Sequence, residues 1–161
     1  MTAALQQTND NLLLIGGVSG AGKSACLRNI KKQEGVLYMN CESGKKLPFR
    51  NKFISKTITD PYQVFEGFNW AETNPDVHTI VIDSLSFLMD MFVSVHIMNS
   101  ADSRSQWQAY AEYFKTMMQQ YVAKSTKNVI IITHIAEDVD EEKGIRTEQA
   151  VIKGGLKGTG I

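Results

Sequence analysis

NLLLIGGVSGAGKS, residues 11–24, is an apolar run that passes into glycines and ends on Gly-Lys-Ser. The segment from Gly17 to Ser24 matches the pattern G-x-x-x-x-G-K-[ST] at every fixed position. Residues 12–15 are typical of a short buried strand, and residues 24–32 carry apolar side chains at helical spacing. We therefore expect a strand, a glycine-rich loop and a helix in that order.

A loop of this kind presents successive backbone N–H groups at the start of a helix, where the helix dipole also favours anions. We expect the Lys23 ammonium to reach the β- and γ-phosphates of a nucleotide, and the Ser24 hydroxyl to ligate a bridging Mg²⁺. The absence of an N-K-x-D motif favours ATP over GTP. The alternative is a glycine-rich turn that binds nothing. The expected binding residues are Gly17, Val18, Ser19, Gly20, Ala21, Gly22, Lys23, Ser24 and Ala25.

Length and composition favour one globular domain over residues 1–161, because 43% of the residues are hydrophobic. The 17 basic and 17 acidic side chains cancel, so no overall field draws the chain to nucleic acid or to a membrane. Cys26 and Cys41 lack C-x-x-C spacing, and we expect both to be packed, reduced thiols. Without a leader-like N-terminus or a membrane-length apolar run, we expect a cytoplasmic protein with no membrane contact.

The rest of the chain alternates between strand and helix patterns. Apolar runs at 36–41, 78–83 and 128–133 predict buried strands, and partial alternation at 52–58 predicts an edge strand. Helices are predicted from Thr59-Asp60-Pro61, over the apolar segment 85–98, and from Gln106, where aromatic and methionine side chains form one stripe. The acidic residues 137–142 and the polar residues 143–147 together predict a mobile loop, and residues 149–152 predict a short strand. This alternation predicts an α/β fold around an open, mostly parallel sheet.

Ligands of such sheets lie at the carboxyl ends of the strands, where Gly17, Glu42, Asp83 and His134 are expected to meet. Asp83 ends a buried strand and is expected to hold the Mg²⁺ hydration shell, although it could instead cap the next helix. Because Ser84 and not a glutamate follows Asp83, the base that activates water is expected to be Glu42. His134 has the position of a γ-phosphate sensor, although a strand-end histidine can also serve only local hydrogen bonds.

The order of these parts resembles the RecA-type ATPase core. GVSGAGKS resembles its Walker A loop, YMNCE the strand with the catalytic glutamate, TIVIDSLSFL the Walker B strand, and NVIIITH the sensor strand. More closely, VIDSLSFLMD, IITHIAED and KGGLKGTG resemble small phage ATPases found beside single-strand annealing and single-strand-binding proteins in recombination modules. The resemblance covers residues 12–161. If the chain is phage-encoded, its compartment would be the host cytoplasm.

The resemblance implies a three-layer P-loop NTPase that hydrolyses ATP with Mg²⁺. It assigns Lys23 and Ser24 to phosphate and metal, Asp83 to Mg²⁺, Glu42 to water activation and His134 to sensing. It further implies a homo-oligomer, either a ring or a filament, and an annealing or single-strand-binding partner. Single-stranded DNA would face residues 98–105 and 136–148.

Two features depart from this family pattern. The segment 136–148 is acidic, with only Lys143 and Arg146 to meet phosphates, so strong electrostatic DNA binding there is not supported. The core of the family continues beyond residue 161, so we expect a core that is truncated or unusually short. Lys153 and Lys157 lie in the stretch that resembles the donor of a cation to a neighbouring subunit's site.

Two other functions compete with the ATPase. GVSGAGKS is also close to the P-loop of gluconate and adenylylsulfate kinases, which predicts a small-molecule kinase. Such kinases need several arginines around the transferred phosphoryl group, whereas the four arginines here are scattered and no compact lid is visible. The other alternative is an ATP-dependent assembly scaffold with little hydrolysis, in which Glu42 would be dispensable.

Overall fold

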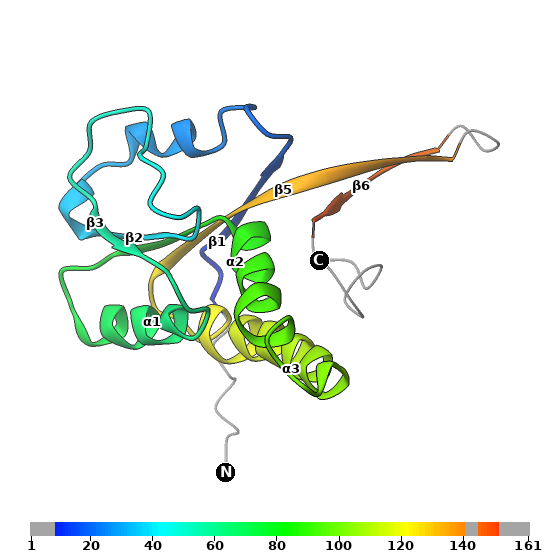
Figure 1. Ribbon diagram of the computed structural model, residues 1–161. Helices are drawn as coiled ribbons and strands as arrows, with labels where there is room; N and C mark the ends of the chain where they lie inside the picture. Colours follow the sequence, from blue (N-terminus) through cyan, green and yellow to red (C-terminus); the bar gives the residue numbers. More distant parts are fainter. Residues whose placement is uncertain (1–8, 141–144, 152–161) are drawn as a thin grey trace, which may run out of the picture.

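A central sheet organises the computed structural model, which describes residues 9–140 and 145–151. The strands are β1 (Leu12–Gly17), β2 (Val36–Asn40), β3 (Ile54–Thr57), β4 (Thr79–Asp83), β5 (Asn128–Asp140) and β6 (Ile145–Ala150). Their order is β1-β5-β4-β2-β3 with every pair parallel, and β6 alone pairs antiparallel, with the far part of β5 (Figure 1). The predicted mostly parallel sheet is therefore confirmed, with β3 at one edge.

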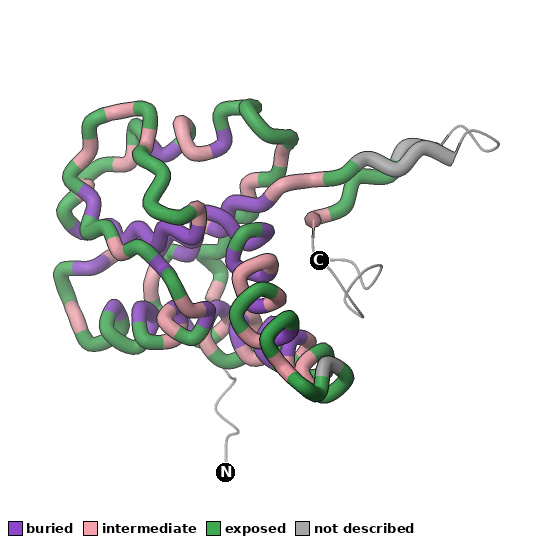
Figure 2. The backbone as a smooth tube through the Cα atoms, in the orientation of Figure 1, coloured by how far each residue is buried: buried purple, intermediate pink, exposed green. Residues whose placement is uncertain are grey.

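The sheet is covered on both faces, which gives three layers. On one face lie α1 (Gln63–Thr73), α2 (Leu85–Phe92) and α3 (Ser103–Thr116), the last two continued by π-helical turns at Val93–Ile97 and Met117–Val122. On the other lie two short 3₁₀ helices, η1 (Ser24–Asn29) and η2 (Gln33–Gly35). Alternation along β4 separates the layers: Ile80 and Ile82 pack with the α-helices, whereas Val81 packs with Leu27 of η1. The buried residues accordingly follow the sheet and its helical face (Figure 2).

The predicted helices exist, but two of their starts are displaced: α2 begins at Leu85 as predicted, whereas α1 begins at Gln63 and α3 at Ser103 instead of Gln106. Asp60 Oδ1 accepts a 2.9 Å hydrogen bond from the backbone N–H of Tyr62 just before α1, and the helix ends before Asn74-Pro75. On α3 and the π-helical turn that follows it, Tyr110, Phe114 and Met117 are buried in the core shared with α1 and α2, which confirms most of the stripe as core, whereas Trp107 is 36% exposed.

Several predictions of helix and burial were wrong. The predicted helix over residues 24–32 is only the six-residue η1, because Leu27 is its one buried residue and Ile30 is already extended. Leu12, Leu13 and Leu14 are 44%, 52% and 43% exposed, because β1 ends the strand order and pairs only with β5 in the described residues. The helix 85–98 is buried only in part, with Phe87, Val95 and Met98 exposed, and Cys26 is exposed rather than packed.

Of the segment 137–147 predicted to be a mobile loop, the described residues belong to a β-hairpin, and residues 141–144 lie outside the described residues. β5 continues to Asp140, and β6 returns from Ile145, with backbone pairing from Asp140–Ile145 to Ile135–Ala150. The hairpin extends past the end of the sheet (Figure 1). A backbone ladder needs no apolar side chains, so composition alone gave the wrong prediction here. Of the strand predicted at 149–152, only Gln149 and Ala150 belong to β6; Val151 is not in a strand, and residue 152 lies outside the described residues.

Candidate functional site

The glycine-rich loop between β1 and η1 holds the ammonium group of Lys23 against its own backbone carbonyls. Gly20 and Gly22 have φ of +80° and +83°, which L side chains rarely adopt, although a Cβ at either position would meet no atom within 4 Å. Lys23 is buried, and its Nζ donates hydrogen bonds to the carbonyls of Gly17 at 2.9 Å and Val18 at 2.8 Å. The loop therefore curls around the ammonium group at the carboxyl end of β1.

The carboxyl ends of four parallel strands meet beside this loop. Gly17 is in register with His134, and Asp83 is in register with Asn40 on one side and Ile132 on the other. Glu42 follows Asn40 by two residues. Strand register thus brings together the four positions that the sequence placed at this edge.

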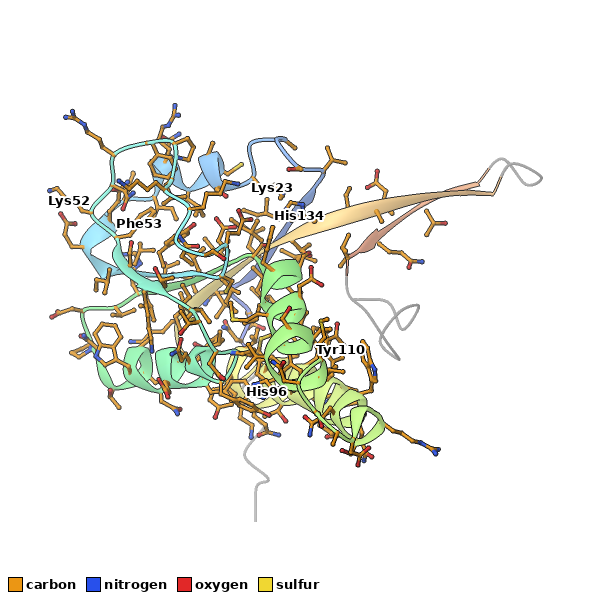
Figure 3. The ribbon with its side chains drawn as sticks, in the orientation of Figure 1. Lys23, Lys52, Phe53, His96, Tyr110 and His134 are labelled. Carbon is orange, nitrogen blue, oxygen red and sulfur yellow. The ribbon has the colours of Figure 1, made fainter. Side chains whose placement is uncertain are left out.

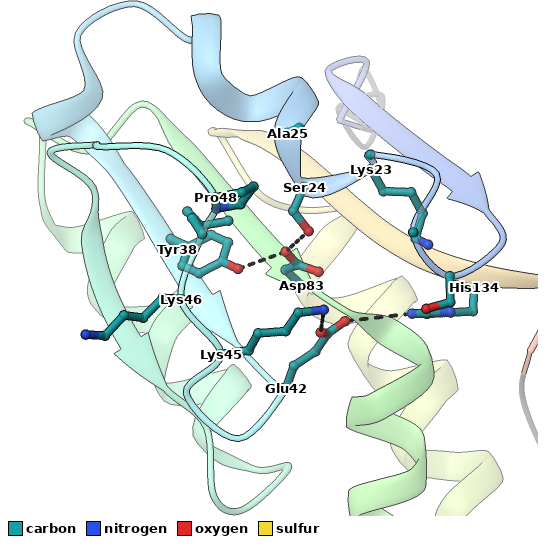
Figure 4. A pocket seen from close by; sticks show the side chains of 14 residues that line it. Lys23, Ser24, Ala25, Tyr38, Glu42, Lys45, Lys46, Pro48, Asp83 and His134 are labelled. Atoms are coloured by element: carbon teal, nitrogen blue, oxygen red, sulfur yellow. Dashed lines mark hydrogen bonds and ion pairs between the residues drawn. The ribbon is translucent and has the colours of Figure 1, made fainter.

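Asp83, at the end of β4, is almost fully buried and holds two donors on one oxygen. Its Oδ2 accepts from the Ser24 hydroxyl at 2.7 Å and from the Tyr38 hydroxyl at 2.8 Å (Figure 4). Its Oδ1 is buried and has no hydrogen-bond partner among the described residues. Burial, followed by the nearby Asp83 charge, raises the pKa of Tyr38, so this phenol remains a donor.

The pair of Ser24 and Asp83 fits a Mg²⁺ ion shared with phosphates. Mg²⁺ in nucleotide sites takes few protein oxygens and completes its shell with water and phosphate. A hydroxyl and a carboxylate 2.7 Å apart, with one buried carboxylate oxygen unpaired, provide such a partial set. In the described residues no group of three His, Cys, Asp or Glu side chains forms a protein-only metal site.

Glu42 lies in a turn that is held by its neighbours. The Asn40 amide donates to the Lys45 carbonyl at 2.8 Å, and the Asn40 Oδ1 accepts from the Glu42 N–H at 2.9 Å. Glu42 Oε2 pairs with Lys45 Nζ at 2.9 Å, and Glu42 Oε1 lies 3.7 Å from His134 Nε2. The hydrogen bond to Glu42 raises the pKa of Lys45, which stays charged. Because Lys45 is 73% exposed, solvent screens this pair.

His134 is fixed by contacts from α2. Its backbone N–H donates to the Ser86 hydroxyl at 3.0 Å, and its ring meets Phe87 edge-on with centroids 5.6 Å apart. The imidazole is thereby held beside Glu42, between β5 and the start of α2 (Figures 3 and 4).

A cavity of about 260 Å³ joins these groups. Lys23, Ser24, Asp83, Glu42 and His134 all line it, as do Ser19, Gly20, Gly22 and Ala25 of the loop. Three expected binding residues are not among its lining: Gly17 and Val18 hold Lys23 through their carbonyls, and the Ala21 N–H donates to Val18 at 3.3 Å. His134 lies beside the start of the loop, because Gly17 is its register partner on β1, and Glu42 Oε1 lies 3.7 Å from the His134 ring.

The alternative role of Asp83 as a helix cap is not what the structure shows. Ser84 occupies the N-cap position of α2 without a side-chain cap hydrogen bond. Asp83 Oδ2 instead accepts hydrogen bonds from the Ser24 and Tyr38 hydroxyls.

Sequence reasoning missed five lining residues of the cavity: Tyr38 and the four residues from Lys45 to Pro48. A signal for Tyr38 was available, because it stands in a buried strand at the same-face spacing as Asn40 and Glu42. Lys45 carried no such signal, since its approach to Glu42 depends on a turn with positive φ at Ser43 and Gly44.

The segments expected to face DNA lie elsewhere. Within 98–105, Met98 is 75% exposed, and Asp102 caps α3 by accepting from the Ser105 N–H at 3.2 Å, which lowers the pKa of Asp102. The described residues of segment 136–148 belong to the β5–β6 hairpin, and residues 141–144 lie outside the described structure. Lys143, Lys153 and Lys157 fall outside the described residues.

The comparison with protein families supports the fold class. A family model described as an AAA domain matches residues 9–157. A solved structure of the pCW3 conjugation coupling protein TcpA, in its monomer form with ATPgS, is similar at 20% identity and a TM-score of 0.48. That match covers 76% of this chain, which spans only 42% of the other. No curated protein matches, and no helix in the described residues is long and apolar enough to cross a membrane.

Proposed function

This chain belongs to the AAA domain family and is a P-loop domain that binds ATP, and from that premise we propose that it hydrolyses ATP with Mg²⁺. The observation that supports hydrolysis is the position of Glu42. Its carboxylate lines the same cavity as Lys23, Ser24 and Asp83. Its side chain is only 13% exposed, which is unusual for a glutamate in a turn.

In the proposed reaction, Glu42 accepts a proton from a water that attacks the γ-phosphorus. The bond between the γ-phosphorus and the β–γ bridging oxygen breaks, and ADP leaves with that oxygen. Glu42 Oε2 is occupied by Lys45, so Oε1 is the oxygen available to the water. Lys23 neutralises charge on the β- and γ-phosphates, and His134, 3.7 Å from Glu42 Oε1, registers the presence of the γ-phosphate.

Mg²⁺ would be held by the Ser24 hydroxyl and, through water, by Asp83, and it would withdraw charge from the phosphate oxygens. The residues of this chain prepare that position. Tyr38 keeps Asp83 Oδ2 engaged, so that Oδ1 stays unpaired in the described structure. Ser24 already lies against the carboxylate, at the start of η1.

We also propose that the ATPase acts in DNA recombination or replication of phage type, on single strands and with an annealing or single-strand-binding partner. The support is the sequence resemblance of 12–161 to small phage ATPases. Residues 98–105 and 136–148 are the proposed strand-facing segments. A homo-oligomer, with Lys153 or Lys157 acting on the neighbouring site, belongs to the same proposal.

A γ-phosphate release assay tests the hydrolysis. The full chain is incubated with Mg²⁺ and γ-labelled ATP under three conditions: alone, with single-stranded DNA, and with a panel of small phosphoryl acceptors. We expect Mg²⁺-dependent release of inorganic phosphate, which single strands stimulate. Transfer of label to a small acceptor would identify a kinase instead. ATP binding without release under every condition would identify a scaffold.

A further inference from the structure

The chain has no net charge, yet its cations are concentrated in one part of the sequence. Seven of the 17 Lys and Arg side chains lie between residues 28 and 52, with only two carboxylates, Glu34 and Glu42. The remainder of the chain is therefore net acidic. The seven cations are all exposed: Arg28, Lys31, Lys32, Lys45, Lys46, Arg50 and Lys52.

Folding joins the two halves of this stretch into one surface. The Arg28 guanidinium lies 5.8 Å from the centre of the Phe49 ring, and the Lys52 N–H donates to Gln33 Oε1 at 3.1 Å. Lys52 Nζ also pairs with Glu34 at 2.9 Å. Residues 28–34 and 45–52 thus form one corner of the molecule, the basic corner, with Lys52 on its outside (Figure 3). In Figure 1 this corner lies apart from the β5–β6 hairpin and from the connection between α2 and α3.

A second cavity, of about 500 Å³, opens in the basic corner. Its lining includes three cations, Lys45, Lys46 and Arg50, together with amides and hydroxyls such as those of Asn51 and Thr57. No carboxylate side chain lines it. Because Tyr38, Lys45 and Lys46 also line the nucleotide cavity, the two hollows adjoin.

Two of the three cations that line this second cavity have no carboxylate partner in the described residues. Lys45 is paired with Glu42, but in the described part of the chain neither Lys46 nor Arg50 has a carboxylate within 4.0 Å. Unpaired cations beside amide and hydroxyl donors suit phosphate oxygens. The cavity therefore has the chemistry of an anion site next to the nucleotide.

We propose that the basic corner binds the phosphodiester backbone of a single-stranded nucleic acid, which passes through the cavity lined by Lys46 and Arg50. This inference rests on the proposed function and adds a further strand-binding surface, separate from the proposed segments 98–105 and 136–148. The cations continue outside the cavity, with Lys52 on the outside of the corner and Arg28 against the Phe49 ring, so a polymer of phosphates is favoured over one small phosphorylated molecule. A flexible single strand can also enter a hollow that a duplex can only cover.

Charge reversal in the full chain tests the surface. Fluorescence anisotropy of a labelled oligothymidylate is measured at low and high salt for wild type and for Lys31→Glu with Arg50→Glu. We expect the double variant to bind about tenfold or more weakly at low salt, with a salt slope smaller by about 1.4 if two phosphate contacts are lost. Lys115→Glu with Lys124→Glu, on the helical layer, is the matched control and should bind as wild type does.

Further measurements separate a loss of strand binding from a defect in folding or in ATP hydrolysis. Thermal unfolding and DNA-independent phosphate release should match wild type in both double variants, and Arg50→Gln provides a milder change should the reversal disturb folding. Equal weakening in the control, or none in the test variant, would overturn the inference. So would displacement of the strand by inorganic pyrophosphate at equal phosphate concentration, or tighter binding to duplex or to anionic vesicles. If the test variant loses strand binding while its ATP turnover stays normal, the defect belongs to the basic corner alone. A wild type that binds the strand but never hydrolyses ATP contradicts only the proposed function.

Discussion

The Tyr38 hydroxyl donates a 2.8 Å hydrogen bond to Asp83 Oδ2, which links the middle of β2 to the end of β4 directly under the nucleotide cavity. Ser24 donates to the same oxygen from the start of η1. One carboxylate oxygen is thereby held by two elements, while the other is buried with no partner in the described residues. This arrangement orients Asp83 before any ligand arrives.

Removing the Tyr38 hydroxyl should weaken the response to Mg²⁺. In Tyr38→Phe, Asp83 keeps Ser24 but loses its donor from β2, so the carboxylate is less well oriented. Hydrogen bonds to charged groups contribute about 1.5–3 kcal/mol, which predicts a roughly ten- to hundredfold higher Mg²⁺ concentration for half-maximal phosphate release. Tyr113→Phe is the matched control, because that buried hydroxyl donates to the Pro61 carbonyl at 2.8 Å, away from the site. Identical Mg²⁺ titrations of the two variants would contradict this role.

Lys23→Ala should remove nucleotide binding. The ammonium group is buried in the loop, where it meets two carbonyls and lines the cavity. We expect ATP with Mg²⁺ to raise the unfolding temperature of wild type but not of this variant, since stabilisation follows ligand affinity. Lys127→Ala removes a similar contact, from Nζ to the Asn74 carbonyl at 3.1 Å, outside the cavity lining. That control should keep the ATP-dependent shift, and a normal shift in Lys23→Ala would show that the loop binds nucleotide without its lysine.

Two leucines on different strands should differ in their contribution to stability. Leu37 on β2 is 3% exposed, whereas Leu13 on β1 is 52% exposed. Leu37→Ala should lower the free energy of unfolding by about 2–5 kcal/mol, as for other buried leucines. Leu13→Ala should cost less than about 1 kcal/mol, because little of its surface is buried. Urea unfolding compares them, and equal losses would mean that the β1 edge is covered in solution.

The two cysteines should react at very different rates. Cys26 is exposed, whereas burial, followed by the nearby Asp83 charge, raises the pKa of the Cys41 thiol well above its usual range. Cys41 therefore stays protonated at mildly alkaline pH, and the thiolate is the reactive form. Ellman's reagent should label one thiol rapidly in the native protein and the second only on unfolding. Rapid labelling of both, or of none, would conflict with the packing around β2.

The sheet edge could be predicted from the sequence because its residues follow apolar runs. Asp83 and His134 each end such a run, and parallel strands bring run ends together. The hydrogen bond from Tyr38 to Asp83 could not be predicted, because it depends on which strand lies beside β4. The pairing of Lys45 with Glu42 could not be predicted either, because it needs a left-handed backbone at Ser43.

Helix length and loop structure were harder to predict because tertiary packing decides them. Residues 24–32 have helical spacing, but only Leu27 of η1 reaches the core, and the α-helix does not form. The acidic segment after His134 suggested a loop, yet β5 and β6 pair through their backbones there. Residue spacing and composition describe only the side chains. Both errors arose where backbone hydrogen bonding or packing against neighbouring layers decides the structure.

The central claim is that Glu42 activates water in a cavity where Lys23, Ser24 and Asp83 hold the triphosphate. Single-turnover hydrolysis of ATP by Glu42→Gln tests it most directly, with ATP affinity measured on the same protein. We predict ATP affinity within about threefold of wild type and a hydrolysis rate lower by about 10²-fold or more, the usual contribution of a general base. Hydrolysis at the wild-type rate by a variant that binds ATP normally would contradict the account.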